Sequence, residues 1–422
     1  MLIEFNVANF QTLRDAQRFS LVKGKGTELQ QTNVFRTPEP NEFELLRSAA
    51  IYGPNASGKT TFIRALGTMR DIVLKSATTR SAGDELPLTP FLLSGETRDK
   101  PSEFEVSFLL DGVRYQYGFS ATAKQIHDEW LFAFPRGRAQ RWFQRAWNPE
   151  IGEHEWYFGD KLEGEKQVWQ KSTRANALFL STAVNLNAQQ LQPIYDWFRT
   201  HLRVVGVGGW SPDFSASQCE SGQKASILEF LRAADLAIQD IVVEKVPFDV
   251  RKLPDEMPEP FKQALISDLK DKEVFDLRTV HQADDGRNMS FELEVESAGT
   301  QKLFAFAGPW LDALEQGYTL FIDELNNSLH PRLVRFLVEL FHDPERNHKN
   351  AQLVFTTHET SILSQEILRR DQVWFCERER DQASRLYPLT DFRPRKGREN
   401  LELAYLSGRY GALPFIRQRK SA

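Results

Sequence analysis

The hydrophobic positions near the start of the chain alternate with polar ones and then change their period. Residues 2–9 and 17–22 alternate as strands do, and the apolar run at residues 48–52 predicts a buried strand. Between Phe62 and Val73 the apolar residues recur at helical spacing. The pattern therefore predicts a β-hairpin, a buried strand, a glycine-rich turn and a helix.

The predicted secondary structure changes twice after the first helix. Residues 85–160 read as short strands rich in aromatic side chains, which predicts an antiparallel lobe. Helical patterns dominate residues 172–290, for example at 226–241, and a polar, proline-rich link interrupts them at 252–260. From about residue 290 strands and helices alternate again, so we expect the chain to return to an α/β core there.

Composition narrows the class of protein. The 422 residues are 41% hydrophobic and 26% charged, which excludes a disordered tail and allows one large composite domain or two to three ordinary ones. The net charge of -5 gives the molecule no overall attraction for nucleic acid. Cys219 and Cys376 are too few for a disulfide framework or a cysteine-rich zinc site. With neither a signal peptide nor an apolar run of about 18 residues in view, we expect a cytoplasmic protein without membrane contact.

The strongest chemical signal is a complete GxxxxGK[ST] motif between the predicted strand and helix. Its glycines let backbone N–H groups converge on phosphates, Lys59 reaches the β and γ oxygens, and the Thr60 hydroxyl ligates Mg²⁺. A chance glycine-rich turn would not have this strand and helix on either side. The predicted ATP-binding residues are Gly53, Pro54, Asn55, Ala56, Ser57, Gly58, Lys59, Thr60 and Thr61.

A second apolar strand, at residues 318–322, ends in Asp323 and Glu324. In P-loop proteins such a strand delivers an aspartate to the magnesium shell, and the next carboxylate can polarise the attacking water. Alone, the pair could be an ordinary solvated strand end. Beside a P-loop, we expect Asp323 to hold Mg²⁺ with Thr60, and Glu324 to be catalytic together with Lys59.

Two further elements are ambiguous on physical grounds alone. Ser297 and Gly299 open a helical pattern and could form either an anion site or a simple N-cap. His358 ends the strand at residues 353–357, where an imidazole could bond a γ-phosphate or serve only the structure.

Taken in order, GPNASGKT, ESAGTQKL, LFIDELNNSLHP and VFTTHETSIL resemble the Walker A, signature, Walker B with D-loop, and switch-histidine motifs of ABC-type ATPases. The branch with SMC heads, DNA-repair ATPases and OLD-like ATPases is the most similar. MLIEFNVANFQTLRD and LYPLTDFRPRKGRENLELAYLSGRYGALPFI resemble the RloA or AbiLi type of abortive-infection AAA ATPase. The resemblance covers nearly the whole chain.

The resemblance implies a head-to-tail dimer that hydrolyses ATP with Mg²⁺ and is nearly inactive as a monomer. The signature residues of one copy would cap the γ-phosphate held by the other, and a D-loop would run between the sites. His358 would be the switch histidine. The signature residues are Ser297, Gly299, Thr300 and Gln301, and the D-loop residues are Asn327, Ser328 and His330.

Three departures from the family pattern stand out. The signature reads SAGTQ where transporters have two glycines, and Asn326 stands where many relatives have aspartate. No convincing Q-loop glutamine occurs near residues 86–95. The contact that a Q-loop glutamine makes with magnesium in this family is therefore not assigned to any residue.

A nuclease domain of the OLD type does not fit after His358, because too little chain follows, and the histidines show no HxH or HExxH spacing. We therefore expect any nuclease or toxin to be a separate effector protein. Arginines alternate with aromatics at residues 136–145, and residues 393–398 and 417–420 are basic. These segments could contact nucleic acid, or they could be a packed strand pair and solvated ends.

The predicted fold is α/β, a P-loop NTPase of ABC-ATPase type with an antiparallel β lobe and a helical subdomain inserted at roughly residues 61–296. The predicted parts are listed here: 1–75, the first part of the core; 76–170, the β lobe; 171–290, the helical insertion; 291–422, the second part of the core and a basic tail.

The leading hypothesis for function is an ATPase switch of prokaryotic antiviral defence, acting as a homodimer or higher homo-oligomer. A DNA-repair ATPase is the first alternative, although the chain is acidic and lacks the heptads of long coiled-coil arms. A P-loop kinase would leave LNNSLHP unexplained, and a non-hydrolysing scaffold would not need Glu324.

Overall fold

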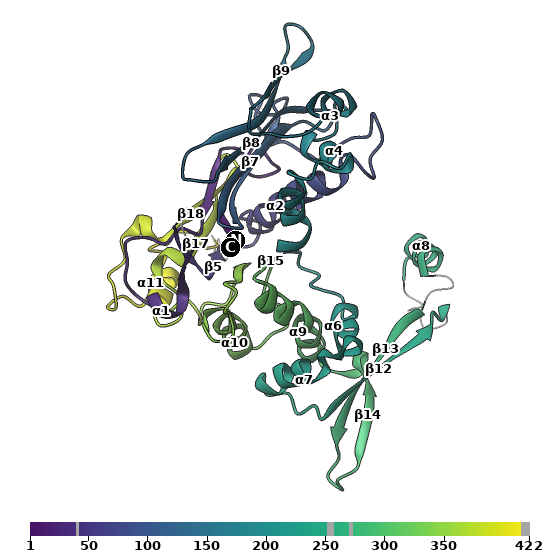
Figure 1. Ribbon diagram of the computed structural model, residues 1–422. Coiled ribbons are helices and arrows are strands. Elements are labelled where there is room, and N and C mark those ends of the chain that lie inside the picture. The colour runs from purple at the N-terminus through teal and green to yellow at the C-terminus, as the bar shows by residue number, and fades with distance from the viewer. Residues whose placement is uncertain (39–41, 251–256, 270–272, 415–422) are drawn as a thin grey trace, which may run out of the picture. The chain divides into compact units, whose positions relative to one another are not determined.

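The computed structural model describes residues 1–38, 42–250, 257–269 and 273–414 (Figure 1). It divides into two units. The first comprises Met1–Gly208, Ala313–Asn327 and Pro331–Ala422, and the second comprises Gly209–Asp312 and Ser328–His330. The basic residues 417–420 and the start of the proline-rich link, 252–256, lie outside the described residues.

A seven-stranded antiparallel sheet joins the predicted N-terminal hairpin to the predicted β lobe. Its strand order is β10-β9-β8-β7-β6-β1-β2, so β1 pairs with β6 about a hundred residues later in the chain. Asp111 (φ 49°) and Gly112 (φ 76°) form the two-residue turn between β6 and β7. Positive φ at both positions lets the turn match the right-handed twist of the two strands. The strands are β1 Leu2–Ala8, β2 Gln17–Ser20, β6 Ser102–Leu110, β7 Val113–Ala121, β8 Ile126–Phe134, β9 Gln140–Asn148 and β10 Glu153–Phe158.

The core sheet has the order β11-β15-β16-β5-β17-β18 and is parallel except for its last strand. Every residue of β5, β15 and β16 is buried, which fits strands covered on both faces. The strands are β5 Ser48–Tyr52, β11 Leu202–Val205, β15 Thr319–Ile322, β16 Gln352–Thr356, β17 Val373–Arg378 and β18 Ser384–Pro388. Because β5 lies between β16 and β17, the P-loop strand is central.

One apolar core joins both sheets of the first unit to helix α2. Phe62 of α2 packs against Phe5 and Phe19 of the seven-stranded sheet, with ring centroids 5.5 Å apart in each pair. The remaining elements of this unit are α1 Gln30–Asn33, β3 Val34–Arg36, β4 Glu44–Leu46, α2 Lys59–Lys75, α3 Lys166–Ser172, α4 Phe179–Asn185, α5 Gln192–Asp196, a π-helical turn Trp197–His201, α10 Pro331–His342, 3-10 turns Arg370–Gln372 and Leu389–Phe392, and α11 Leu401–Leu406.

A buried glutamine fastens the first strand to the core sheet. The Gln352 side chain accepts a hydrogen bond from the backbone N–H of Leu2 (2.7 Å) and donates to the carbonyls of Leu2 (3.0 Å) and Leu46 (3.3 Å). Segments 350 residues apart are thereby held together.

The second unit differs from the helical subdomain that the sequence pattern suggests. It contains an antiparallel sheet of order β12-β13-β14 beside its helices. The expected helix through residues 226–241 is wrong at its end, because α7 stops at Ala233, Asp235 has φ of 63°, and β12 begins at Asp240. The elements are α6 Asp213–Gln218, a π-helical turn Cys219–Gln223, α7 Lys224–Ala233, β12 Asp240–Pro247, α8 Glu259–Leu269, β13 Glu273–Gln282, β14 Asn288–Glu292, a 3-10 turn Leu293–Val295, and α9 Ala298–Gln316, whose last turn belongs to the first unit.

The arginine- and aromatic-rich segment at residues 136–145 forms the tip of the β8–β9 hairpin and most of β9. Trp142 and Phe143 are buried in the apolar core. Arg145 is buried beside Glu129 (Nε to Oε2, 3.2 Å), so its guanidinium cannot reach a phosphate in solvent. The packed strand pair is therefore the better reading of this segment.

Glu129 anchors a buried polar network in the β lobe. Its carboxylate accepts hydrogen bonds from the Tyr117 hydroxyl (3.0 Å) and from the first N–H groups of α4, at Phe179 (2.7 Å) and Leu180 (3.0 Å). Burial raises the pKa of Glu129, and Arg145 opposes that rise. The network ties strands β7, β8 and β9 to a helix N-terminus.

Within the described part of the chain, no helix is long and apolar enough to cross a membrane.

Candidate nucleotide-binding site

The P-loop connects the buried strand β5 to helix α2, and two of its glycines are required by close contacts. A Cβ atom on Gly53 would lie 2.2 Å from the carbonyl oxygen of Cys376, and one on Gly58 would lie 2.3 Å from Ser384 Oγ. Gly58 also has φ of 107°, which side chains other than glycine rarely adopt. Only glycine lets the loop pack this closely on β17 and β18.

Lys59 is the first residue of α2, and its side chain folds back under the loop. Its ammonium group donates to the carbonyl oxygens of Gly53 (2.7 Å) and Pro54 (3.0 Å) and lies 3.3 Å from His358 Nε2. Burial lowers the pKa of Lys59, although Cys376, Glu324 and Asp323 oppose this shift. The lysine is therefore a largely desolvated cation directly beneath the loop.

The two carboxylates at the end of β15 have different environments. Asp323 is 2% exposed, whereas the Glu324 side chain is 33% exposed and has φ of 51° at its backbone. A positive φ at a non-glycine residue is a strained conformation of a kind that clusters at functional sites. Glu324 Oε1 lies 3.9 Å from His358 Nε2.

Thr356, the last residue of β16, holds both carboxylates in place. Its hydroxyl donates to Asp323 Oδ1 (2.6 Å) and accepts from the backbone N–H of Glu324 (2.7 Å). Thr356 is fully buried, so its hydroxyl has a fixed set of partners. Sequence reasoning did not find this residue, because nothing in the LVFTTH pattern marks it as a bridge to β15.

Asn326 connects the end of β15 to the histidine. Its side-chain oxygen accepts hydrogen bonds from the His358 backbone N–H (3.1 Å) and the Thr357 hydroxyl (2.9 Å). An aspartate could accept the same two bonds, so the departure at Asn326 keeps this contact. Burial, then the nearby Lys59, lowers the pKa of His358, and Glu324 opposes the shift. The imidazole is therefore neutral near pH 7.

The donor set fits a magnesium ion. Asp323 Oδ2 is buried and, among the residues that the structure describes, has no hydrogen-bond partner. Thr60 and Asp323 both line one cavity of about 470 Å³, and Thr60 also lines the P-loop cavity of about 330 Å³. A carboxylate and a hydroxyl are oxygen ligands of the kind Mg²⁺ takes from a protein, with waters and phosphates supplying the rest.

The P-loop cavity also has two walls that the sequence did not predict. It is lined by Asn55–Thr61, Glu324, Thr12 and Arg378. Thr12 reaches it because its hydroxyl accepts a hydrogen bond from Ser384 Oγ (2.9 Å), and Arg378 ends β17. Neither residue is marked as a site residue by its sequence context, and only the tertiary fold brings them to the loop.

The predicted signature and most of the predicted D-loop belong to the second unit. Ser297 Oγ accepts from the backbone N–H of Thr300 (3.1 Å), so Ser297 caps helix α9. Gln301 donates to the carbonyls of residues 294 and 296, and a Cβ on Gly299 would lie 3.1 Å from the carbonyl oxygen of Ser328. Asn327, Ser328 and His330 are exposed.

A family model described as "AAA domain, putative AbiEii toxin, Type IV TA system" matches residues 48–364. The chain belongs to this AAA family. It is accordingly an AAA-domain protein with a P-loop, and the predicted α/β P-loop fold is confirmed. The AAA match begins at the first residue of β5 and ends after His358, so it contains the P-loop, both carboxylates and the histidine.

The AAA chain is also similar to a solved structure, the SMC head domain from Thermotoga maritima. The two are 13% identical, the similarity covers 92% of this chain and 98% of that one, and the TM-score is 0.40. A comparison with curated proteins finds no match.

Proposed function

We propose that this AAA protein binds ATP with Mg²⁺ in the P-loop cavity and hydrolyses it. The observation that carries the proposal is the convergence of Lys59, Asp323, Glu324 and His358 on one loop, with Thr356 bridging the two carboxylates. Phosphoryl transfer to water requires groups of these kinds. Lys59 is a cation for the phosphates, and Asp323 has a buried carboxylate oxygen without a hydrogen-bond partner among the described residues. The partly exposed Glu324 carboxylate lies next to the neutral His358.

Each group has a distinct role in the proposed reaction. Lys59 exchanges its carbonyl partners for β- and γ-phosphate oxygens, and Thr60 and Asp323 hold the magnesium ion. Bound magnesium neutralises charge on the phosphates. Glu324 orients and polarises the attacking water, and His358 donates a hydrogen bond to the γ-phosphate.

We further propose that the active form is a head-to-tail dimer, with Ser297, Gly299, Thr300 and Gln301 of one copy facing the P-loop of the other. The capped start of α9 supports this role, since N–H groups at a helix N-terminus favour an anion. Asn327, Ser328 and His330 are exposed, as the proposed contact with a second copy requires.

A mixing experiment tests the dimer. Ser297→Arg puts a bulky side chain at the start of α9 and should stop hydrolysis without emptying the P-loop, whereas Lys59→Ala should stop it by weakening ATP binding. Mixing the two inactive variants forms some dimers with one intact composite site. With random pairing and independent sites, turnover recovers to at most about a quarter of the wild-type value, and to less if the sites are coupled.

The matched control is Ser290→Arg, which places the same side chain on the exposed strand β14 of the same unit. It should retain wild-type turnover. Wild-type turnover in Ser297→Arg itself would refute the trans arrangement, while leaving the P-loop assignment to be judged by Lys59→Ala.

For the biological role, we propose a regulatory ATPase of abortive infection, of the RloA or AbiLi type, that controls a separate nuclease or toxin. The family description, which names a putative toxin of a type IV toxin–antitoxin system, supports a role in this kind of biology. Bacteria carrying the gene with its neighbours should plate phage less efficiently than bacteria carrying the Lys59→Ala version. Equal plating, with turnover stimulated by DNA, would favour a DNA-maintenance role instead.

A further inference from the structure

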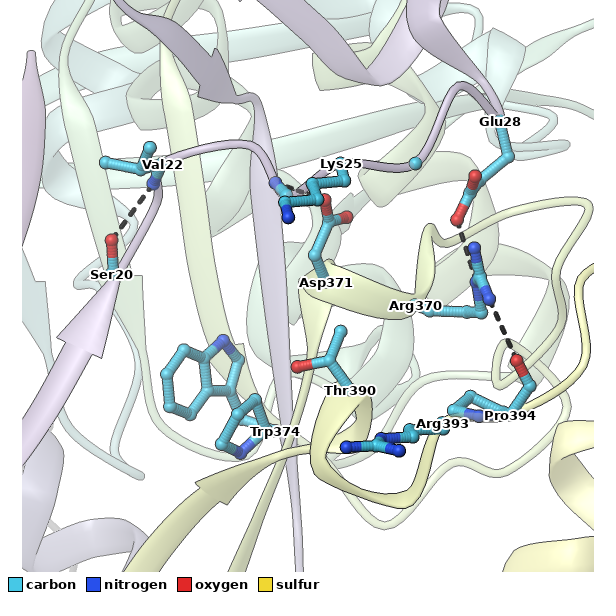
Figure 2. Close-up of a pocket in the computed structure, with 13 residues that line it drawn as sticks. Ser20, Val22, Lys25, Glu28, Arg370, Asp371, Trp374, Thr390, Arg393 and Pro394 are labelled. Carbon is cyan, nitrogen blue, oxygen red and sulfur yellow. Dashed lines mark hydrogen bonds and ion pairs between the residues drawn. The ribbon is translucent and has the colours of Figure 1, made fainter.

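A third cavity lies in the first unit, apart from the two cavities that Thr60 lines. Its volume is about 570 Å³, within the range of roughly 300–1,000 Å³ typical of small-molecule sites. The segment after β2, the turn before β17 and the segment after β18 enclose it (Figure 2). Its lining residues are Ser20, Val22, Gly24, Lys25, Gly26, Glu28, Arg370, Asp371, Trp374, Pro388, Thr390, Arg393 and Pro394.

The two carboxylates of this cavity are already neutralised by arginines. Glu28 accepts from Arg370 (2.9 Å), and Figure 2 shows Arg370 lying between Glu28 and the carbonyl of Pro394. Asp371 pairs with the buried Arg369 (2.7 Å) and accepts the backbone N–H of Gly24 (2.8 Å). Each acid is thus paired with an arginine, although Glu28 Oε2 is buried without a hydrogen-bond partner among the described residues.

Two further cations, Lys25 and Arg393, line the cavity, and both residues are exposed to solvent. Among the described residues, none forms a hydrogen bond or ion pair with the Lys25 ammonium or the Arg393 guanidinium. Arg393 begins the basic segment at residues 393–398, whose Lys396 lies 3.8 Å from Glu28. Arg393 and Pro394, the first two residues of this basic segment, therefore line the cavity.

An unused hydrogen-bond donor lies in the wall. Trp374 is 7% exposed, and its indole Nε1 is buried without a hydrogen-bond partner in the described structure. Leaving a buried donor unpaired is costly, and native proteins rarely do so unless a ligand or water completes the bond. Val22 and Pro388 add apolar surface beside the tryptophan.

We propose that this cavity binds a phosphorylated nucleoside, with the phosphate monoester between Lys25 and Arg393 and an acceptor atom on the Trp374 N–H. Two exposed cations without an acidic partner among the described residues can attract an anion, and a cavity of about 570 Å³ with apolar residues in its lining can hold a molecule larger than inorganic phosphate. The same chemistry is offered by a free mononucleotide and by the 5′-phosphate end of a nucleic-acid strand.

The cavity is distinct from the ATP site. It lies at the start of β17, whereas the P-loop packs on the other end of that strand, where the Cys376 thiol donates to the Ser57 carbonyl (3.1 Å). Because β17 runs parallel to β5, the P-loop and the cavity flank opposite ends of the core sheet. This cavity and the P-loop cavity share no lining residue.

Calorimetric titration with AMP in magnesium-free buffer tests the proposal. Wild type and Lys59→Ala should bind one AMP per chain with similar affinity, because the P-loop lysine is not involved. The double variant Lys25→Glu/Arg393→Glu should weaken binding by roughly tenfold or more, since two charge-assisted contacts become repulsions. Trp374→Phe keeps an aromatic side chain but removes the N–H and part of the ring volume, and it should weaken binding less than the double variant does.

A charge-matched control is Lys124→Glu/Lys171→Glu, which reverses two exposed lysines outside both cavities and should bind AMP as wild type does. Circular dichroism and urea midpoints verify that every variant is folded. AMP binding that is lost in Lys59→Ala but kept in Lys25→Glu/Arg393→Glu would overturn the proposal, because the P-loop would then be the site.

A tetranucleotide with and without a 5′-phosphate distinguishes the two sources of ligand. Binding of AMP identifies a free nucleotide as sufficient, and binding of the phosphorylated tetranucleotide alone identifies a strand end. Equal binding of the 5′-hydroxyl tetranucleotide, or binding of none of the three probes, would overturn the proposal.

Discussion

Replacing Thr356 with valine would remove the hydroxyl that bridges the two carboxylates while keeping the shape of the side chain. In the structure this hydroxyl donates a hydrogen bond to Asp323 Oδ1 and accepts one from the backbone N–H of Glu324. The variant would lose the hydrogen bonds that this hydroxyl makes with the Asp323 carboxylate and with the Glu324 backbone N–H. We expect hydrolysis of ATP to fall much more than ATP binding.

The two lost contacts set the magnitude. A hydrogen bond to a charged group contributes about 1.5–3 kcal/mol, and one to a neutral amide contributes about 0.5–1.5 kcal/mol. If the charged contact is needed in the transition state, turnover should fall roughly 10- to 100-fold, since about 1.4 kcal/mol corresponds to a factor of ten. The same bonds stabilise the fold, so the free energy of unfolding should fall by about 2–4 kcal/mol.

Steady-state phosphate release at saturating ATP and a range of Mg²⁺ concentrations measures the effect, together with urea unfolding. The matched control is Thr319→Val, an equally buried threonine at the other end of β15, whose hydroxyl donates to Gln352 (3.2 Å). It should lose stability but keep its turnover per folded molecule. If both variants hydrolysed ATP equally well, Thr356 would be a structural residue and the bridging argument would be refuted.

Three other predictions concern hydrolysis, packing and pH. Glu324→Gln should still bind ATP but slow turnover by roughly 10²- to 10⁴-fold in single-turnover assays; binding as weak as that of a P-loop variant would contradict the role in water activation. Glu129→Ala should lower the free energy of unfolding by about 3–5 kcal/mol, because it leaves the buried Arg145 without its partner; a loss below about 1 kcal/mol in urea titrations would show that water replaces the carboxylate. Burial lowers the pKa of His342 to about 3 in the native state. Below about pH 6.5 the unfolded chain therefore binds a proton at this histidine that the native state does not bind. The free energy of unfolding should fall by about 1.4 kcal/mol per pH unit between about pH 6.5 and 3. His342→Gln removes the titrating group, although it also alters the contact with Ser48, and should show a flatter dependence on pH in this window; an equally steep dependence would assign the effect to other groups.

The parts of this fold that the sequence predicted are those that depend on short stretches of chain. The buried strand, the glycine-rich loop and the following helix are adjacent in sequence, and each has its own pattern, so β5, the P-loop and α2 could be identified together. The same holds for β15 and β16, since a carboxylate pair or a histidine directly follows an apolar run.

The parts that were not predicted depend on long-range pairing. The alternation of β1 shows that it is a strand, but not that its partner is β6 rather than the core sheet. Thr12 and Arg378 reach the P-loop cavity only after residues from opposite ends of the chain have packed together. The end of α7 was missed because the helical spacing was followed to residue 241, whereas the chain leaves the helix after Ala233, has a positive φ at Asp235 and enters β12 at Asp240.

The position of β5 between β16 and β17 has a consequence for synthesis on the ribosome. Ser48 pairs with Leu353, a residue made roughly 300 positions later, so at about 5–20 residues per second the nascent P-loop strand waits about 15–60 s for its neighbours. We expect translation products that stop before β16 to carry the complete glycine-rich motif and yet have no place in a sheet for it. Such fragments would expose the apolar strand β5 to chaperones and proteases, and nucleotide binding would begin only when nearly the whole chain had emerged.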